Sequence, residues 1–270
     1  MATRSAVINV MMRAADKAAR GLKRDFGEVS ALQVSRKGPA DFVSTADLKA
    51  EKVLREELRR ARPDYGFLME ESGESGKRNG PRRWIVDPLD GTTNFLHGLP
   101  HFAISIALED AGEIIAGLVY DPAKDDLFYA EKGTGAYLND RRIRVSSRTR
   151  LEDAIFGTGI PFKGTGGEAA FTAELQGFMR ETAGVRRWGV ASLDLAYVAA
   201  GRFDGFWERG LNAWDIAAGI LLVREAGGYV SAIDGGPFVL DGGSILATTD
   251  GLHRPVTELL ARATCENSPA

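Results

Sequence analysis

The stretch from Trp84 to Phe95, WIVDPLDGTTNF, decides the fold and carries the densest chemistry of the chain. Its first three residues are apolar and predict the end of a buried strand, after which Pro88 and Gly91 turn the backbone. Asp87 and Asp90 are therefore presented at the carboxyl end of a strand, where open α/β sheets usually carry their sites.

Two carboxylates held this close repel each other unless a cation neutralises them, and oxygen ligands favour Mg²⁺ or Mn²⁺ over zinc. Gly91 and Thr92 would aim backbone N–H groups and a hydroxyl at the same point, which suits an anion beside the metal. A site for metal and phosphate is the first hypothesis. The alternative is an ordinary turn, because Asp-Pro and Asp-Gly are common turn dipeptides, and this stretch alone leaves both open.

The composition indicates a globular protein with a substantial core. The chain has 270 residues, of which 44% are hydrophobic and 26% charged, with a net charge of −3 and a pI of about 5.8. These values exclude a disordered chain and give no overall basic field for nucleic acid. The single cysteine, Cys265, excludes an internal disulfide framework, and no apolar run approaches the roughly 18 residues that span a bilayer. We expect a cytoplasmic protein.

The expected elements form one domain, residues 1–270, with two halves. The first half, to about residue 150, has two helices and closely spaced strands at 65–69, 84–86, 102–108, 113–120 and 126–132, with a hairpin at 139–140, which predicts an antiparallel sheet. From 151 to about 263, strands at 202–208, 229–233 and 245–248 alternate with helices at 166–182, 192–200, 214–226 and 253–263. Ser192 is the expected N-cap of its helix.

The first helix has two interpretations. Its apolar residues recur at helical spacing among Arg and Lys, as in a transit peptide, but Asp16 and Asp25 favour an ordinary surface helix.

Three further acidic positions stand at the ends of expected elements. Asp47 lies three residues after Ser44 in a capping-box pattern, Asp215 opens an apolar helix, and Glu70 and Glu71 follow a short strand, where only one of the pair can easily face a site. A helix cap or a solvated turn is the commoner role for each one taken singly. Asp215, however, is a polar group at the edge of a core and needs a partner.

Four motifs, in this order and spacing, resemble the inositol monophosphatase family, and its bacterial SuhB-type members in particular. They are DFVSTAD (41–47), MEES (69–72), DPLDGTTNF (87–95) and WDIAAG (214–219). The resemblance implies a layered α-β-α-β-α sandwich, of mixed α+β and α/β character, of the metal-dependent sugar phosphatase type. It also implies Mg²⁺-dependent, Li⁺-sensitive hydrolysis of small phosphate monoesters, usually by a homodimer.

The resemblance also implies a ligand set for two Mg²⁺ ions. Glu70, Asp87 and the carbonyl of Leu89 would hold the first ion, and Asp87, Asp90 and Asp215 the second. In sites of this kind one ion lowers the pKa of its bound water and the other stabilises the leaving alkoxide.

Further matches concern the phosphate and the attacking water. The phosphate would lie on the metals and on the amides of Gly91 and Thr92, while Thr92 and Asp47, with Glu70 close by, match the groups that orient the water. Lys37 matches a mobile loop that closes over the site and is associated with a third, weaker ion.

The substrate is less well determined than the metal site. Glu208 matches a family residue that binds an inositol hydroxyl, a role that Asp90 and Asp215 would share, and a plain surface charge is the alternative. RRWGVAS (186–192) departs from the usual RxxGSAA at Val190 and Ser192, which leaves the shape of the sugar pocket open. Inositol 1-phosphate is the leading hypothesis, and histidinol phosphate, fructose 1,6-bisphosphate, a nucleotide 3′-phosphate or a sugar phosphate are the alternatives.

A binding role is the alternative from a different class. The SuhB-type resemblance permits a partner in RNA or the transcription apparatus, and the Arg-rich segments 141–144 and 186–187 could serve it, although solvated surface is the commoner explanation of such segments. Against binding as the sole role, all the metal-site residues implied by the resemblance are present.

Overall fold

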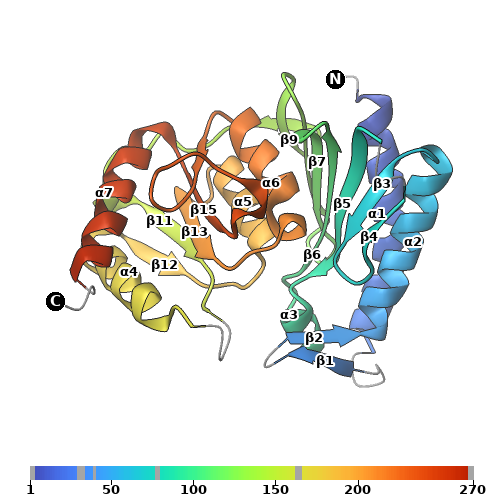
Figure 1. The fold of residues 1–270 in the computed structure, drawn as a ribbon, viewed down its shortest axis with the longest axis horizontal. Helices are drawn as coiled ribbons and strands as arrows, with labels where there is room; N and C mark the ends of the chain where they lie inside the picture. Colours follow the sequence, from blue (N-terminus) through green and yellow to red (C-terminus); the bar gives the residue numbers. More distant parts are fainter. Residues whose placement is uncertain (1–3, 29–33, 39–40, 77–79, 162–165, 267–270) are drawn as a thin grey trace.

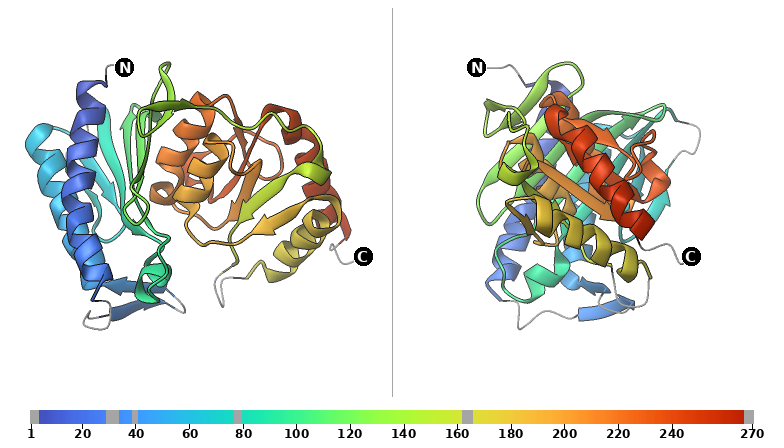
Figure 2. Two further views of the ribbon diagram at one scale, coloured as in Figure 1. Left: turned by 180° about the vertical axis from the view of Figure 1, so that it is seen from behind. Right: turned by 90° about the vertical axis from the view of Figure 1, so that its left-hand side faces the viewer.

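The chain folds into five layers that alternate between helices and sheets (Figure 1). The computed structural model describes residues 4–28, 34–38, 41–76, 80–161 and 166–266; for 34–38, 41–43 and 264–266 it describes the backbone alone. The helical layers are α1 (Ala6–Phe26) with α2 (Thr45–Ala61), then α5 (Ala191–Ala199) with α6 (Ala213–Glu225), then α4 (Glu168–Glu181) with α7 (Asp250–Glu266). The second pair lies between the two sheets, and the other pairs cover the outer faces (Figure 2). This is the α-β-α-β-α layering that the sequence predicts.

The larger sheet has eight strands in the order β10-β9-β8-β7-β6-β5-β3-β4. All its pairs are antiparallel except β3 with β5, so the predicted antiparallel sheet is confirmed apart from that one pair. The strands are β3 (Gly66–Met69), β4 (Gly73–Ser75), β5 (Arg82–Asp90), β6 (Ala103–Asp110), β7 (Glu113–Asp121), β8 (Asp126–Glu131), β9 (Gly135–Leu138) and β10 (Arg141–Ile143).

The second sheet has five strands in the order β12-β11-β13-β15-β14. Its first three strands are parallel, and β15 runs antiparallel to both neighbours. They are β11 (Ile155–Thr158), β12 (Gly184–Arg186), β13 (Gly205–Arg209), β14 (Tyr229–Ser231) and β15 (Ser244–Thr248). Smaller elements are the ribbon β1 (Val34–Gly38) and β2 (Asp41–Ser44), the short helix α3 (Thr92–Leu96) and the 3₁₀ turns η2 (Leu151–Asp153) and η3 (Leu240–Gly242).

Several predicted boundaries differ from the structure by a few residues, and two of these differences follow from specific hydrogen bonds. The strand expected at 202–208 begins at Gly205, because the N–H groups of Arg202 and Phe203 still donate to Tyr197 at the end of α5. The helix expected from Ser192 begins at Ala191 after an N-cap at Val190, so Ser192 lies inside the first turn. The N–H of Ser192 donates to the carboxylate of Asp90.

The central helices are buried on all sides, and glycines let them approach their neighbours closely. A Cβ at Gly219 of α6 would overlap Leu195 of α5, and one at Gly117 of β7 would lie 2.8 Å from the carbonyl oxygen of Ala218. The apolar side chains of α5 and α6 form one core with both sheets. Close packing of this kind fixes the start of α6 relative to the larger sheet. None of the described helices combines the length and apolar character needed to cross a bilayer.

Candidate active site

The site is built around an irregularity where β5 ends. Asp87 pairs with Ser105 of β6 and Asp90 with Ala103, so three steps along β5 match two along β6. Pro88 lies inside this bulge, where its missing N–H costs the ladder nothing. A bulge changes the direction in which side chains point, so Asp87 and Asp90 do not follow the regular alternation between the two faces of the sheet. The N–H of Leu89 donates to the buried carboxylate of Asp87 at 2.9 Å.

Gly91 is required at its position for two reasons. Its φ of 92° is left-handed, and a Cβ there would lie 2.7 Å from a methyl of Val190 and 3.3 Å from the carbonyl oxygen of His101. The chain then enters α3, where the hydroxyl of Thr92 lies 2.8 Å from Asp47 and 3.1 Å from the carbonyl oxygen of Leu89.

Asp47 caps a helix and also reaches Thr92. Its Oδ2 accepts from the N–H of Ser44 at 2.8 Å and from the Ser44 hydroxyl at 2.6 Å, which confirms the predicted capping box. The other oxygen accepts from Thr92. Burial raises the pKa of Asp47, and the hydrogen bonds from Ser44 and Thr92 oppose that rise. The capping role therefore leaves one oxygen for the pair with Thr92.

Asp90 joins the two halves of the chain. Its carboxylate accepts from the N–H of Ser192 in the first turn of α5, at 2.8 Å. Burial raises the pKa of Asp90 to about 6, against the lowering effect of the hydrogen bonds from Ser192. The serine expected to cap α5 thus contributes its backbone to the site.

Asp215 comes to the same place from the start of α6. It accepts from the N–H of Asn212 at 2.7 Å, as a capping residue does. Burial and then the charge of Asp90 raise the pKa of Asp215 to about 8. The pKa of Asp87 is raised well above its usual range by burial and by the charges of Glu70, Asp90 and Asp215. These four carboxylates, which we call the carboxylate cluster, therefore act on one another.

Glu70 is the member of the acidic pair after β3 that belongs to this cluster. Its N–H donates to Val86 of β5 at 3.2 Å, and its charge acts on Asp87, Asp90 and Asp215. The N–H of Glu71 instead donates to Glu51 of α2 at 2.9 Å, away from β5. The spacing of the residues left open which of the two faces the site, the family resemblance implied Glu70, and the structure favours Glu70 as well.

The carboxylate cluster fits a hard cation by its chemistry. In the described ranges no three acidic, His or Cys side chains stand as a set of metal ligands, and Asp87, Asp90 and Asp215 each accept from a backbone amide. The four groups offer oxygen alone, however, and their repulsion is what a divalent ion relieves.

Glu208 lies near the cluster at the end of β13. Burial, followed by the charges of Asp215 and Asp90, raises its pKa to about 8, so it is no ordinary surface charge. Its carboxylate lies directly over Gly159, where any Cβ would overlap it. Glycine at position 159 therefore makes room for this side chain.

Sequence reasoning missed Asp194 and Asn94. Asp194 is buried in α5, and neither of its carboxylate oxygens has a hydrogen-bond partner within the described structure. Burial and the charge of Glu208 raise its pKa well above the usual range. The sequence did contain a signal for Asp194, namely an acidic residue inside the otherwise largely apolar run ASLDLAYVA. Asn94 had none beyond its place in the DGTTN motif.

Lys37 could not be placed relative to the cluster. It belongs to β1, whose side chains lie outside the described residues. The partner strand β2 contacts α3, the helix of Thr92.

The fold and the site together define a layered α/β protein with an oxygen-only acidic cluster beside a Gly-Thr turn. The sequence profile of the Inositol monophosphatase family matches residues 3–268. The chain belongs to this family, whose members are metal-dependent phosphatases.

Individual relatives agree with this assignment. The chain is 59% identical to a Rhizobium meliloti protein named inositol-1-monophosphatase, over 96% of this chain and 97% of that protein. It is 44% identical to the Nus factor SuhB of Escherichia coli K12, over 98% of each. Among solved structures, the extragenic suppressor protein SuhB from Bartonella henselae is similar with a TM-score of 0.92 and 56% identity, covering 95% of this chain and 98% of that one.

Proposed function

We propose that this protein hydrolyses inositol 1-phosphate to inositol and phosphate with Mg²⁺. One observation carries the proposal. The carboxylate cluster and the Asp47–Thr92 pair meet at the end of β5, where the strand has its bulge. Relatives named inositol-1-monophosphatase at 56–59% identity support the choice of substrate.

We assign the ions to the carboxylate cluster. Glu70, Asp87 and the carbonyl of Leu89 would hold one Mg²⁺, and Asp87, Asp90 and Asp215 a second; a third is assigned to the segment of Lys37. Bound Mg²⁺ supplies charge neutralisation and a water that ionises more readily.

The chain's own groups orient the reactants. Thr92 gives its hydroxyl hydrogen to Asp47, so the lone pairs of Oγ1 remain to accept from the attacking water. The phosphate lies on the amides of Gly91 and Thr92. The water oxygen bonds to phosphorus as the bond to the inositol oxygen breaks. The net result is the transfer of one proton from the water to the inositol oxygen, so the products are inositol and hydrogen phosphate.

Acidic groups surround the place assigned to the sugar. Glu208, Asp90 and Asp215 interact electrostatically and come from three different elements. Carboxyl oxygens accept from the hydroxyls of a polyol, and Glu208 is the one of the three that is not assigned to a metal.

We assign the protein to the cytoplasm, as a homodimer. Two apolar side chains are exposed near His101. The carbonyl oxygen of Leu99 accepts from the N–H of His101 at 2.8 Å, and the ring of Trp188 meets that of His101 edge-on at 4.9 Å between centroids. We infer that this surface contributes to the dimer contact. Light scattering of the purified protein tests the dimer, and a monomer at micromolar concentration contradicts it.

The function is tested by phosphate release from a panel of monoesters, with and without Mg²⁺ and Li⁺, using Asp90→Asn as the blank. We expect inositol 1-phosphate to be preferred and its hydrolysis to be lost without Mg²⁺, with Li⁺ and in the variant. Preference for histidinol phosphate, fructose 1,6-bisphosphate or a nucleotide 3′-phosphate would leave the metal site and remove the assignment of the sugar pocket.

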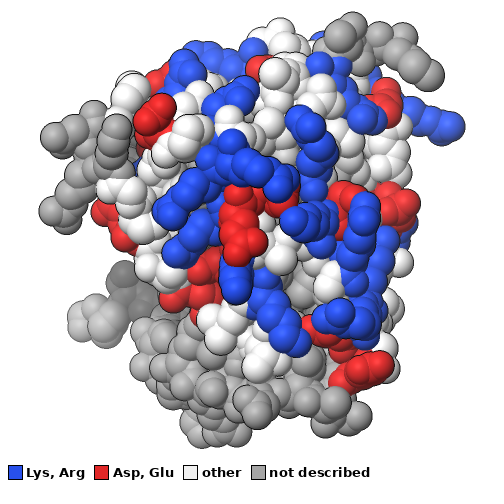
Figure 3. Space-filling view, turned by 90° about the vertical axis from the view of Figure 1, so that its right-hand side faces the viewer, with Lys and Arg blue, Asp and Glu red and all other residues white. Residues whose placement is uncertain are grey.

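A second candidate function, binding to RNA or the transcription apparatus, is favoured by the outer face of α1 and α2. Lys and Arg cover much of this face (Figure 3), and residues 4–62 contain 14 of them against 8 Asp and Glu, in a chain whose net charge is −3. The relatives named Nus factor SuhB support the same idea. The two Arg-rich segments that the sequence offered for such a partner belong to other elements. Residues 141–144 lie in and just after β10, and residues 186–187 lie at and just after the end of β12.

This candidate is tested by RNA binding at increasing salt. A role for this face predicts that Lys52→Glu with Arg59→Glu weakens binding and lowers its salt dependence, while Asp90→Asn binds as wild type does. Equal binding by the charge-reversed protein would remove this face from the proposal.

A further inference from the structure

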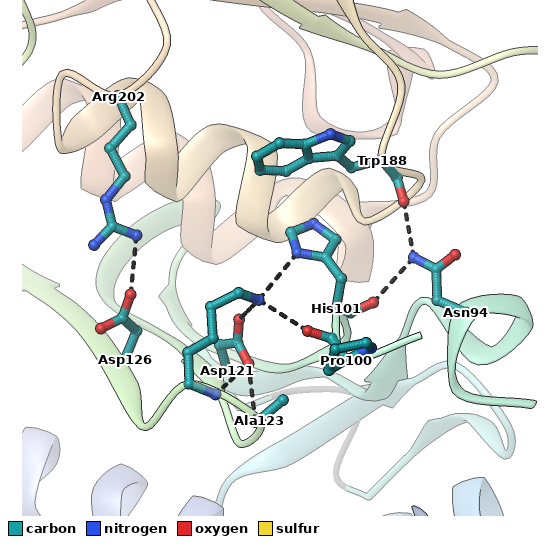
Figure 4. Close-up of polar contacts among 9 residues, drawn as sticks. Asn94, Pro100, His101, Asp121, Ala123, Asp126, Trp188 and Arg202 are labelled. Carbon is teal, nitrogen blue, oxygen red and sulfur yellow. Dashed lines mark hydrogen bonds and ion pairs between the residues drawn. The ribbon is translucent and has the colours of Figure 1, made fainter. Parts of the chain in front are cut away.

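One side chain that neither the metal assignment nor the catalytic assignment uses joins the two halves of the site. The amide nitrogen of Asn94 in α3 donates to the carbonyl oxygen of Trp188 at 2.8 Å and to that of His101 at 3.0 Å (Figure 4). Both partners are carbonyls, which only accept, so the nitrogen and not the oxygen of the amide must face them. Both amide hydrogens are thereby used.

The two segments held by Asn94 are the ones that enclose Gly91. The carbonyl oxygen of His101 and a methyl of Val190, two residues after Trp188, both lie within 3.3 Å of where a Cβ at Gly91 would stand. Two residues further on, the N–H of Ser192 holds the carboxylate of Asp90. The loop before α5 therefore sets both the packing on Gly91 and the orientation of Asp90.

Packing also holds this loop. The ring of Trp188 contacts the rings of His101, Phe203 and Tyr197 at 4.9, 5.3 and 5.6 Å between centroids, and Val190 is buried. The hydrogen bonds of Asn94 add a polar attachment to these contacts.

His101 is itself held firmly, because its Nδ1 lies 3.2 Å from the ammonium of Lys124, which also reaches the carbonyl of Pro100 and the carboxylate of Asp121. Burial lowers the pKa of His101 to about 4, so the ring is neutral at pH 7 and accepts from Lys124.

We propose that Asn94 is a positioning residue of the active site, whose amide fixes the loop before α5 so that Ser192 orients Asp90 and Val190 packs on Gly91. The proposal rests on the proposed function for its activity measurement, but its Mg²⁺ measurement is independent of the substrate.

Three variants remove or keep the two donors. Asn94→Ala removes both, Asn94→Asp places a carboxylate against two carbonyl oxygens, and Asn94→Gln keeps both donors on a longer arm. Thr93→Ala, at the exposed neighbouring position of α3, is the local control. Asn9→Ala removes a side-chain amide of α1 that donates to the carbonyl oxygen of Arg4, before the helix. This variant controls for the loss of an amide elsewhere in the chain.

The experiment measures the Mg²⁺ concentration that gives half of the thermal stabilisation, together with kcat and KM for phosphate release. Because Asn94→Ala and Asn94→Asp lose both hydrogen bonds to the two carbonyls, we expect them to raise the Mg²⁺ midpoint and lower kcat/KM by about tenfold or more. Asn94→Gln should recover part of both, and the two controls should match wild type.

Every other outcome either supports or overturns the positioning role of Asn94. A purely structural role of Asn94 predicts a lower Tm in the variants with an unchanged Mg²⁺ midpoint, and that result overturns the proposal. Unfolding of all three variants, or a wild-type protein that Mg²⁺ does not stabilise, overturns it too. If wild type releases phosphate from no ester while Asn94→Ala still shifts the Mg²⁺ midpoint, the positioning role stands and the proposed function falls.

Discussion

Two helices of this protein, α2 and α6, begin with the same local device and use it differently. In each, an aspartate at the third helical position accepts from the N–H of the N-cap residue, Asp47 from Ser44 at 2.8 Å and Asp215 from Asn212 at 2.7 Å. Asp47 is fully buried, and all its hydrogen bonds are with neutral donors. Asp215 is partly exposed and faces the charges of Asp90 and Glu70.

The difference shows what a capping motif leaves undetermined. The cap places a carboxylate in the first turn of a helix and uses one of its oxygens. What the carboxylate meets next depends on the neighbouring element, which is α3 for Asp47 and the end of β5 for Asp215. One carboxylate therefore orients a hydroxyl, and the other joins a repulsive cluster.

The largest effect is expected for Asp215→Asn. The amide oxygen can still accept from Asn212, so the cap and the fold should persist, whereas the charge assigned to Mg²⁺ is lost. We expect kcat to fall on the order of 10³-fold or more with little change in Tm. Phosphate-release kinetics and thermal unfolding measure the two quantities. Turnover near the wild-type level would remove Asp215 from the metal site.

Asp47→Asn should lower stability as well as activity, whereas Asp215→Asn should lower activity with little change in stability. An amide cannot accept from Ser44 and Thr92 as a carboxylate does, so we expect a loss of about 1–3 kcal/mol in unfolding free energy. The water-orienting pair is also broken, and kcat should fall about 10²–10⁴-fold. Ser44→Ala is the matched control, since it weakens the cap by about 1 kcal/mol and leaves Thr92 paired with Asp47. Equal turnover in the two variants contradicts the proposed role of Asp47.

A smaller effect is expected for Gly159→Ala. The new Cβ would overlap the carboxylate of Glu208 and displace it, while the carboxylate cluster is untouched. We expect KM for inositol 1-phosphate to rise about tenfold, as for the loss of one substrate contact, and the Mg²⁺ midpoint to stay constant. Glu208→Gln should behave similarly. Gly21→Ala, where a Cβ meets nothing within 4 Å, should leave KM unchanged.

The smallest effect is the pH dependence of stability without Mg²⁺. The pKa values of Asp215 and Glu208 are about 8 in the folded protein, above their ordinary values of 3.8 and 4.5. The folded state therefore binds more protons than the unfolded state between about pH 4 and 8, and its stability falls as pH rises through that window.

In EDTA, we expect Tm at pH 8 to be lower than at pH 5.5 by about 2–4 °C, roughly 1 kcal/mol, since both groups are partly exposed. Mg²⁺ binds the deprotonated carboxylates, so its stabilising effect should grow over the same range. Asp215→Asn should flatten the profile. A Tm that rises from pH 5.5 to 8 in EDTA would contradict the raised pKa values.

Much of the fold was predictable, since its signals are local. The strands from β6 to β10 are rich in β-forming residues and separated by short turns, signals that can be recognised within about ten residues. Helix α6 is a largely apolar run followed by two glycines. Two of the boundaries that differ, at Ser192 and at Gly205, are associated with hydrogen bonds to Asp90 and to Tyr197. The bond to Asp90 joins residues far apart in the chain, so the local sequence does not reveal it.

The candidate site divides in the same way. Asp87, Asp90, Gly91 and Thr92 lie close together in the chain, so their residue types offered a metal and phosphate site as a hypothesis, with an ordinary turn as the alternative. Asp194 and Asn94 were missed because their importance comes from contacts across long separations: the charge of Glu208 near Asp194, and the carbonyl of Trp188 against Asn94.

The sequence by itself indicated which residues offer carboxylate oxygens, that Ser44 and Asp47 form a capping box and that Gly91 lies in a turn, because these properties depend on neighbours within a few residues. Tertiary structure alone decided that Ser192 gives its amide to Asp90 and that Gly159 makes room for Glu208. The physical reason is that burial and charge repulsion are properties of the space between elements, and only the packing of α5 and α6 between the two sheets creates that space.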